Sequence, residues 1–249
     1  MRTGHGTAVT SKDRIGALAS SAIGLSHDGK LVRSLTSAVL AHVRAEILSC
    51  RLKPGEKLLI AGLAKRFGVS LSAVREALSR LVAEDLVRAE DQRGFRVSPV
   101  SLEALRDITR TRIELETIAL RHSIELGDAR WEERIRAAYR RLSAARLPRR
   151  RDSGREFEAW RTRHHEFHLA VLAACGSQWL IRLRNILFEQ SERYRFLSYN
   201  LRPRDIDGEH RAIMQATLAR DADTAVRALA GHLDLTARII AEGNSGALG

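Results

Sequence analysis

The 249-residue sequence is poor in cysteine, in proline and in long apolar runs. Its two cysteines, Cys50 and Cys175, have no CxxC partner, which excludes a disulfide scaffold and favours a reducing compartment. Only four prolines interrupt a chain rich in Ala, Leu, Arg and Glu, so most of it should be helical. No segment reaches the roughly 18 apolar residues that a transmembrane helix needs. We therefore expect a cytoplasmic protein that does not enter membranes.

Positive charge is what the sequence has in excess. The 42 Lys and Arg residues against 30 Asp and Glu give a formal net charge of +12. The first 100 residues hold 16 basic and 9 acidic side chains, so the excess per residue is greatest there. Accumulated positive charge attracts polyanions through Coulomb forces and counterion release. The amino-terminal part is therefore the better candidate for binding nucleic acid.

The residue pattern divides the chain into four segments. Residues 1–30 are rich in Gly, Ser, Ala and Thr without helical or strand periodicity, and we predict a flexible arm. Residues 31–100 and 101–243 are predicted as two domains, and residues 244–249 as a flexible tail. In the second domain, apolar spacing predicts helices at approximately 101–126, 129–145, 155–174, 177–197, 205–219 and 222–242.

The apolar spacing within residues 31–100 predicts three helices and a β-hairpin. Apolar residues recur every fourth position from Leu35 to Ile47, as on one face of a helix, and two later runs suit strands around a turn at Gly94. The predicted elements are helices at about 35–49, 60–67 and 71–84, and strands at 86–89 and 95–100. Three helices followed by a hairpin describe a winged helix-turn-helix.

The third of these helices is the candidate for reading DNA. In a helix-turn-helix the second helix of the motif enters the major groove, and its first residues reach base edges. Ser72, Arg75 and Ser79 share the face opposite the apolar stripe, and the guanidinium of Arg75 suits guanine O6 and N7. The predicted DNA-contacting residues are Lys65, Arg66, Ser70, Ser72, Arg75, Ser79, Arg80, Arg93 and Gly94, with Arg96 also on the hairpin. For any single arginine, simple solvation in a basic protein is the alternative.

The same stretch resembles the GntR family of bacterial transcription regulators. The elements that carry the resemblance are GVS at 68–70, VREAL at 74–78, DLV at 85–87 and RG at 93–94. It covers about residues 32–100 and implies a homodimer on a double-stranded DNA operator. Two positions depart from the family pattern: Leu71 stands where an arginine is common, and Ile60 where an acidic residue is common.

Histidines gather in the second domain. The stretch RHHEFH, residues 163–168, places His164 and His168 one helical turn apart, where both imidazoles can reach one ion. The HExxH spacing of a metalloprotease is absent, because Glu166 does not directly follow His164. His210 and His232 fall on two other predicted helices. They either join a common site in the bundle core or serve as a helix cap and an ordinary core histidine.

The second domain is similar to the FCD domain, the all-helical ligand-binding domain of the FadR-type branch of the GntR family. The resemblance covers about residues 102–242. It implies a set of metal ligands at His164, His168, His210 and His232, with His164 where the family commonly has aspartate. It also implies a small organic-acid effector near Arg112, to which we add Arg193 and Arg195 as candidates. A nitrogen-rich ligand set favours Zn or Ni.

The sequence thus predicts a mainly α protein: an N-terminal winged helix-turn-helix followed by an all-α helical bundle. The leading hypothesis is a transcription regulator, in particular a repressor, whose operator binding is controlled by a small carboxylate in a metal-containing pocket, and not an enzyme. One rival is a metal-dependent hydrolase or oxidase with an accessory basic domain, using Glu166 or Glu209 as its base. Another is a nonspecific nucleic-acid binder.

Overall fold

The computed structural model describes residues 35–91, 93–145, 154–197 and 204–243. The predicted arm at 1–30 and the tail at 244–249 lie outside these residues. Contacts divide the chain into two compact units, the first ending at Pro99 and the second beginning at Val100. None of the described helices is long and apolar enough to cross a membrane.

The first unit consists of a small helical core with a three-stranded sheet at its end. Its elements are α2 (Leu35–Leu48), β1 (Lys57–Leu58), α3 (Ile60–Phe67), α4 (Leu71–Ala83), β2 (Val87–Glu90) and β3 (Gly94–Val97). The strands are antiparallel in the order β1-β3-β2. The predicted hairpin is β2 and β3, whereas β1 was not predicted, because two residues are too few to show an alternating pattern. Apolar stripes of α2 and α4 form the core, among them Val43, Val74 and Leu78.

The turn between α3 and α4 is fixed by local chemistry. Gly68 adopts φ +64° at the end of α3, a left-handed conformation that favours glycine. Ser70 then caps α4, because its side chain accepts a hydrogen bond from the backbone N–H of Ala73 at 3.2 Å. The result is the helix-turn-helix that the sequence predicts.

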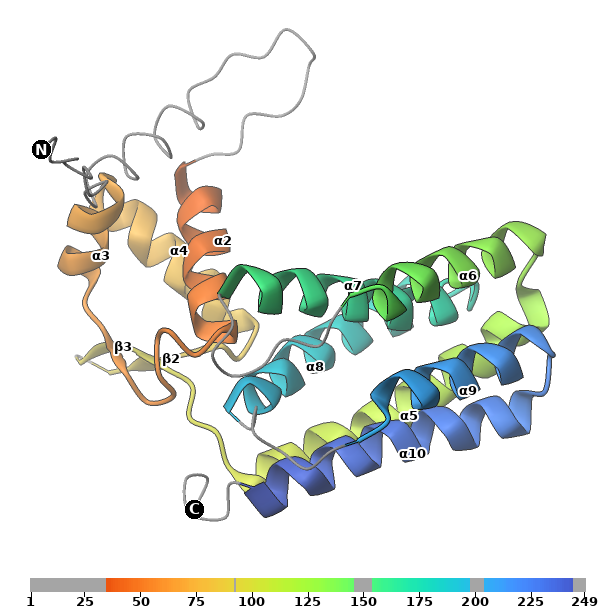
Figure 1. Cartoon of the computed structure of the whole chain (residues 1–249). Coiled ribbons are helices and arrows are strands. Elements are labelled where there is room, and N and C mark those ends of the chain that lie inside the picture. Colours follow the sequence, from red (N-terminus) through yellow and green to blue (C-terminus); the bar gives the residue numbers. More distant parts are fainter. Residues whose placement is uncertain (1–34, 92, 146–153, 198–203, 244–249) are drawn as a thin grey trace, which may run out of the picture. The chain divides into compact units, whose positions relative to one another are not determined.

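The second unit is an antiparallel bundle without strands among its described residues. Its helices are α5 (Leu102–Leu126), α6 (Ala129–Ser143), α7 (Gly154–Leu172), α8 (Gln178–Leu197), α9 (Ile206–Leu218) and α10 (Ala222–Gly243) (Figure 1). Its apolar core includes Leu120, Trp131, Phe167 and Ile213, and the indole N–H of Trp131 donates to the carbonyl of Ala170 at 2.9 Å. The predicted fold class, mainly α with a winged helix-turn-helix and a helical bundle, is confirmed.

Candidate metal centre and nucleic-acid interface

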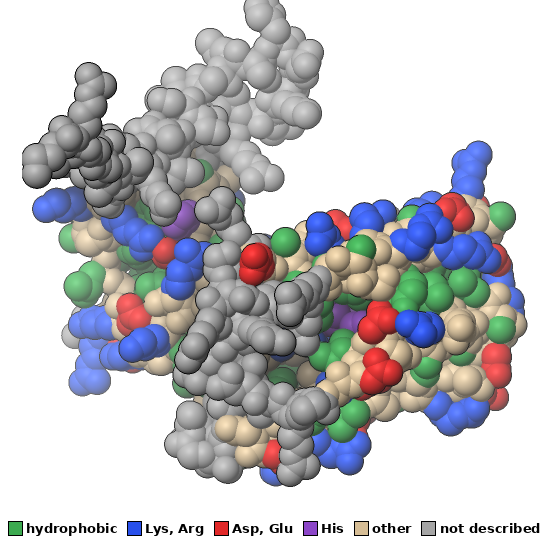
Figure 2. Space-filling model, in the orientation of Figure 1, with side chains coloured by type: hydrophobic (Ala, Val, Ile, Leu, Met, Phe, Trp, Pro, Cys, Tyr) green, Lys and Arg blue, Asp and Glu red, His purple; other side chains and the backbone are tan. Residues whose placement is uncertain are grey.

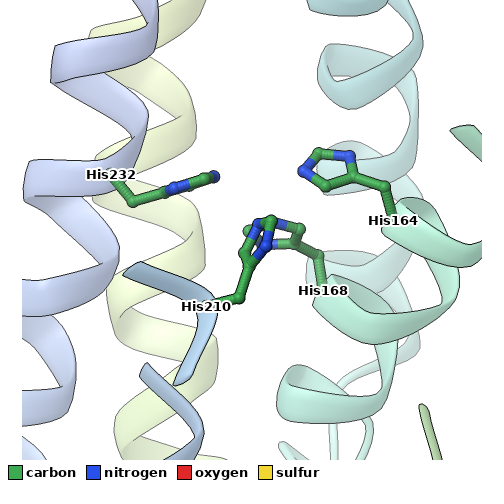
Figure 3. A group of neighbouring side chains, drawn as sticks. All are labelled: His164, His168, His210 and His232. Atoms are coloured by element: carbon green, nitrogen blue, oxygen red, sulfur yellow. The ribbon is translucent and has the colours of Figure 1, made fainter. Parts of the chain in front are cut away.

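Four histidines from three helices meet inside the second unit. His164 and His168 come from α7, His210 from α9 and His232 from α10, and their rings turn toward a common point (Figure 3). One nitrogen of each lies within 4.8 Å of those of the other three. All four residues are buried, with at most 2% of their surface exposed. We call this group the histidine cluster.

The Nε2 atoms of the histidine cluster have no hydrogen-bond partner among the described residues. Nε2 of each of the four is buried without a hydrogen bond, and so is Nδ1 of His164. Burying a polar atom without a partner is unfavourable by about 1–3 kcal/mol. Four such nitrogens around one point therefore indicate a binding site for a ligand that pairs with all of them. A transition-metal ion accepts imidazole lone pairs from several sides at once, and the cluster has the residues to hold one.

The electrostatics of the histidine cluster keep its imidazoles in the metal-binding form. Burial lowers the pKa of three members well below the ordinary value and that of His232 to about 4. The positive charge of Arg195 adds to the shift for three of them, and Arg112 and Arg184 add to it for His168. All four rings are therefore neutral at pH 7, as a metal ligand must be.

One member of the cluster is oriented by a carboxylate. Nδ1 of His232 lies 2.9 Å from Oε2 of Glu209, and Arg204 holds the same carboxylate and donates to the carbonyl of His232 at 3.0 Å. Burial disfavours ionisation of Glu209, but hydrogen bonds from Arg204 and His232 outweigh it and lower the pKa of Glu209 to about 2. The carboxylate thus fixes the proton on Nδ1 and directs the lone pair of Nε2 into the cluster.

His165 and Glu166 of the RHHEFH stretch lie off the cluster, whereas the ring of Phe167 packs against that of His210, with the centroids 5.2 Å apart. His165 packs its ring against Phe188, with the centroids 4.6 Å apart. Glu166 is exposed and forms an ion pair with Arg141 at 3.5 Å. Neither Glu166 nor the engaged Glu209 is positioned as a free general base beside a metal.

Buried arginines stand next to the histidine cluster. Arg112 of α5 donates to Glu116 at 2.9 Å and to the hydroxyl of Ser191 at 2.7 Å. Arg184 of α8 lies 3.4 Å from the same carboxylate and stacks on Phe188. Burial opposes ionisation of Glu116, but the two guanidiniums hold its pKa below the ordinary value. Burial lowers the pKa of Arg184 to about 10, so it stays charged at pH 7.

Two of the three predicted effector residues line a cavity. It has a volume of about 10 Å³, room for about one water molecule. Its lining residues are Leu105, Thr109, Arg112, Ser191, Arg195, Leu233, Thr236, Ala237 and Ile240. Arg193 is buried but does not line the cavity, and its Nη1 donates to Gln190 at 3.1 Å. The sequence did not predict the buried position of Arg184 near these residues, since an arginine in a basic helix gives no signal of burial.

The predicted DNA-contacting residues of the first unit lie on its surface. Ser72, Arg75 and Ser79 of α4 are exposed, as are Lys65 and Arg93. The side chain of Arg75 makes no hydrogen bond or ion pair in the described part of the chain. Lys and Arg side chains cover much of the visible face of this unit, with few acidic ones between them (Figure 2).

Other basic side chains of the first unit are engaged within it. Arg66 forms an ion pair with the buried carboxylate of Glu46, with one N–O distance of 2.8 Å. Arg80 pairs with Glu76 at 2.6 Å on the exposed face of α4. Arg96 pairs with Glu90 at 2.8 Å and donates to the carbonyl of Gly55 at 2.7 Å. These three are less available to phosphate than Arg75 and Lys65.

Comparison with known proteins places the chain in a family. Residues 35–97 match the bacterial regulatory proteins of the gntR family, and residues 107–235 match the FCD domain. The chain belongs to the GntR family. This GntR-family protein is therefore a DNA-binding transcription regulator and not an enzyme, which confirms the prediction from its sequence motifs.

Relatives of this GntR-family protein carry names of the same kind. It is 42% identical over 211 residues to BphR of Paraburkholderia xenovorans, an HTH-type transcriptional regulator, covering 84% of this chain and 86% of BphR. It is 32% identical to the HTH-type transcriptional repressor GlaR of Escherichia coli, covering 82% and 94% of the two chains. The solved structure of E. coli McbR/YncC shares the fold with a TM-score of 0.69 and 23% identity, over 84% of this chain and 98% of that one.

Proposed function

We propose that this protein is a repressor whose operator binding is controlled by a small carboxylate held beside a metal ion in the second unit. The observation that carries the proposal is the convergence of four unpartnered imidazole nitrogens beside buried guanidiniums. The name of GlaR supports the direction of regulation, since that relative is a repressor. A regulator of bacterial promoters acts on chromosomal DNA, so we place it in the cytoplasm.

Zn or Ni suits the histidine cluster best. Imidazole nitrogens bind these ions well, whereas Mg and Ca prefer oxygen ligands. We assign His164, His168, His210 and His232 as the ligands, with Glu209 orienting His232. When bound, the ion would supply positive charge and would accept an anionic ligand as a fifth ligand beside the four imidazoles. The absence of any partner for either nitrogen of His164 supports its inclusion.

The charges around the histidine cluster favour an anion as the effector. Arg112, Arg184 and Arg195 are countered by two buried carboxylates, Glu116 and Glu192. The neutral histidines add no charge, so binding of a divalent ion makes the net charge of the region strongly positive. Nη2 of Arg184 is buried without a hydrogen-bond partner and is a ready donor to a carboxylate. Because charge-assisted hydrogen bonds are strong, a small carboxylate fits this region chemically.

The size of the cavity implies that the effector changes the structure. Room for about one water molecule is too little for a carboxylic acid, so side chains from α5, α8 and α10 must move when it enters. A ligand that binds one arrangement better than another shifts the population between them. The same shift would alter the affinity of the first unit for DNA, and the coupling is typically 5–150-fold.

We assign operator reading to α4 and phosphate binding to the residues around it. Arg75 would contact guanine, with Ser70, Ser72 and Ser79 on the same surface. Lys65, Arg80, Arg93 and the backbone at Gly94 would contact the sugar-phosphate chain. Arg66, which the structure pairs with Glu46, is the weakest of these assignments.

A homodimer on a pseudo-palindromic operator follows from the geometry of helix-turn-helix proteins, in which two half-sites mirror two subunits. An apolar stripe on the second unit offers a surface for it. Trp179, Leu183 and Ile186 of α8 and Ile118 of α5 are exposed by 43–68%. Trp179→Asp should therefore shift the protein toward the monomer in light scattering, while Arg140→Ala, on the exposed face of α6, should not.

The test of the proposed function is operator binding under control of a ligand. Fluorescence anisotropy with DNA from upstream of its own gene, in excess competitor, should show specific binding. Among small mono- and dicarboxylates that raise the melting temperature of metal-loaded protein, at least one should change operator affinity by about 5–150-fold. His210→Ala should abolish that response. Equal affinity for promoter and competitor DNA would contradict operator reading, and a response that survives metal removal would contradict the metal pocket.

A further inference from the structure

The first residue of α4 is an exposed leucine. Leu71 has 54% of its surface exposed, although the other leucines of this helix, Leu78 and Leu81, are fully buried. The neighbouring positions on the outer face of α4 carry serine, arginine or glutamate. An isobutyl group thus stands at the end of the helix that, under the proposed function, enters the major groove.

The hydroxyl groups of this first turn are engaged with one another. Ser70 Oγ caps the helix through Ala73 N–H and lies 2.9 Å from the hydroxyl of Ser72. Leu71 and Arg75 are four residues apart and therefore lie on the same side of the helix, one turn from each other. The free groups that this side presents to a base edge are an apolar side chain first and a guanidinium next.

Among the groups on the floor of the major groove, the C5-methyl of thymine is the one that matches an apolar side chain. Against a phosphate or a base nitrogen, leucine would remove water from a polar group without replacing the lost hydrogen bond. We propose that Leu71 contacts a thymine methyl group in each half-site, next to the base that Arg75 contacts. This inference rests on the proposed function, because it requires α4 to be the recognition helix.

Deoxyuridine gives a direct test, since it differs from thymidine only by that methyl group. Footprinting would first locate the half-sites in DNA from upstream of the gene, and each thymine would then be replaced singly by uracil. At one thymine in each half-site we expect about a fourfold loss of affinity, the factor expected for one buried methyl group. Leu71→Ala should lose about the same factor on the unmodified operator and should no longer distinguish thymine from uracil there.

The matched control is Leu59→Ala, another exposed leucine of the first unit that lies outside α4. This variant should keep the fourfold preference for thymine. If no uracil substitution weakens the wild-type protein, or if the thymine preference persists in Leu71→Ala, the inference is overturned while operator binding stands. Failure of the wild-type protein to prefer its promoter DNA at all would instead overturn the proposed function.

Discussion

The arginines assigned to ligand binding differ between the two units of this protein. In the first unit Arg75 and Arg93 are exposed and carry no ion pair among the described residues, as suits contact with a long polyanion through water and counterions. In the second unit Arg112 and Arg184 are buried and share the carboxylate of Glu116. A buried charge must be paired to be tolerated, so the second arrangement suits a small ligand recognised at short range.

Histidine shows the same contrast. His42 in the first unit is partly exposed, and its Nε2 lies 3.4 Å from the buried carboxylate of Glu46. In the second unit four imidazoles are buried with Nε2 unpaired. Substitutions of the exposed arginines of the first unit should have little effect on folding. Substitutions in the histidine cluster should change ligand binding and stability together. The following predictions use that difference, from the largest expected effect to the smallest.

Removing a ligand of the histidine cluster should have the largest effect. His168→Ala should lose its metal and melt at a lower temperature, because metal binding contributes to folding free energy. Elemental analysis of protein purified without added metal or chelator, together with thermal melts, measures both. His122→Ala is the control, since His122 is exposed on α5. Full metal occupancy in His168→Ala would contradict the assignment.

Acid should destabilise the metal-free protein in a defined window. The buried histidines are neutral in the folded state, with the pKa of His232 at about 4, but take up protons near pH 6.5 when unfolded. The unfolded state therefore binds more protons below pH 6.5, and stability falls as pH drops from 6.5 toward 4. We expect a loss of about 1 kcal/mol per buried histidine for each pH unit. Chemical denaturation of chelator-treated protein at pH 7.5, 6.5 and 5.5 measures the free energy of unfolding at each pH. Equal values at all three would contradict this prediction.

Glu209→Gln should weaken metal binding without removing it. Loss of the carboxylate that orients a histidine ligand typically lowers metal affinity about 10–100-fold. Competition with a chromogenic chelator measures that affinity. Glu166→Gln, next to the cluster in sequence but exposed in the structure, should bind as the wild type does. Wild-type affinity in Glu209→Gln would mean that the carboxylate has no part in orienting His232.

On the DNA side, Arg75→Ala should cost about 1–3 kcal/mol of operator affinity and relax the sequence preference. The melting temperature should not change, because the side chain is exposed. Arg110→Ala, an exposed arginine of the second unit paired with Asp107, is the control and should bind normally. Undiminished operator affinity in Arg75→Ala would contradict its assignment to a base.

The smallest effect on DNA affinity is expected for Lys65→Ala, and it should differ in kind from the effect of changing its neighbour Arg66. Lys65→Ala should reduce the slope of log affinity against log salt by about 1, as expected for one lost phosphate contact, with no change in stability. Arg66→Ala should instead lower stability, because it removes the arginine that pairs with the buried carboxylate of Glu46. Salt titrations and thermal melts of both variants distinguish the two roles, and identical behaviour would refute the distinction.

Much of the fold was predictable because it depends on local pattern. The starts of α3 and α4, at Ile60 and Leu71, and the hairpin turn at Gly94 follow from apolar spacing, an N-cap and glycine. So does the i,i+4 relation of His164 and His168. The helix pattern left the convergence of His210 and His232 on that pair open as one of two alternatives, and the family resemblance favoured it, since spacing along one helix says nothing about which helices meet.

What sequence reasoning missed depends on tertiary packing. Arginine side chains are long and their partners can be far apart in sequence, so the pairing of Arg66 with Glu46 and of Arg184 with Glu116 had no local signal. Glu209 was considered only as a general base, yet in the structure it orients His232. In each case the deciding contact joins residues from different helices.

X-ray absorption at the metal edge of the purified protein tests the central claim most directly. If the histidine cluster binds one ion, the spectrum of a zinc-loaded sample should fit four imidazole nitrogens at about 2.0–2.1 Å, and three in His164→Ala. A site with oxygen or sulfur in place of these imidazoles, or a spectrum that is the same in the variant, would contradict it.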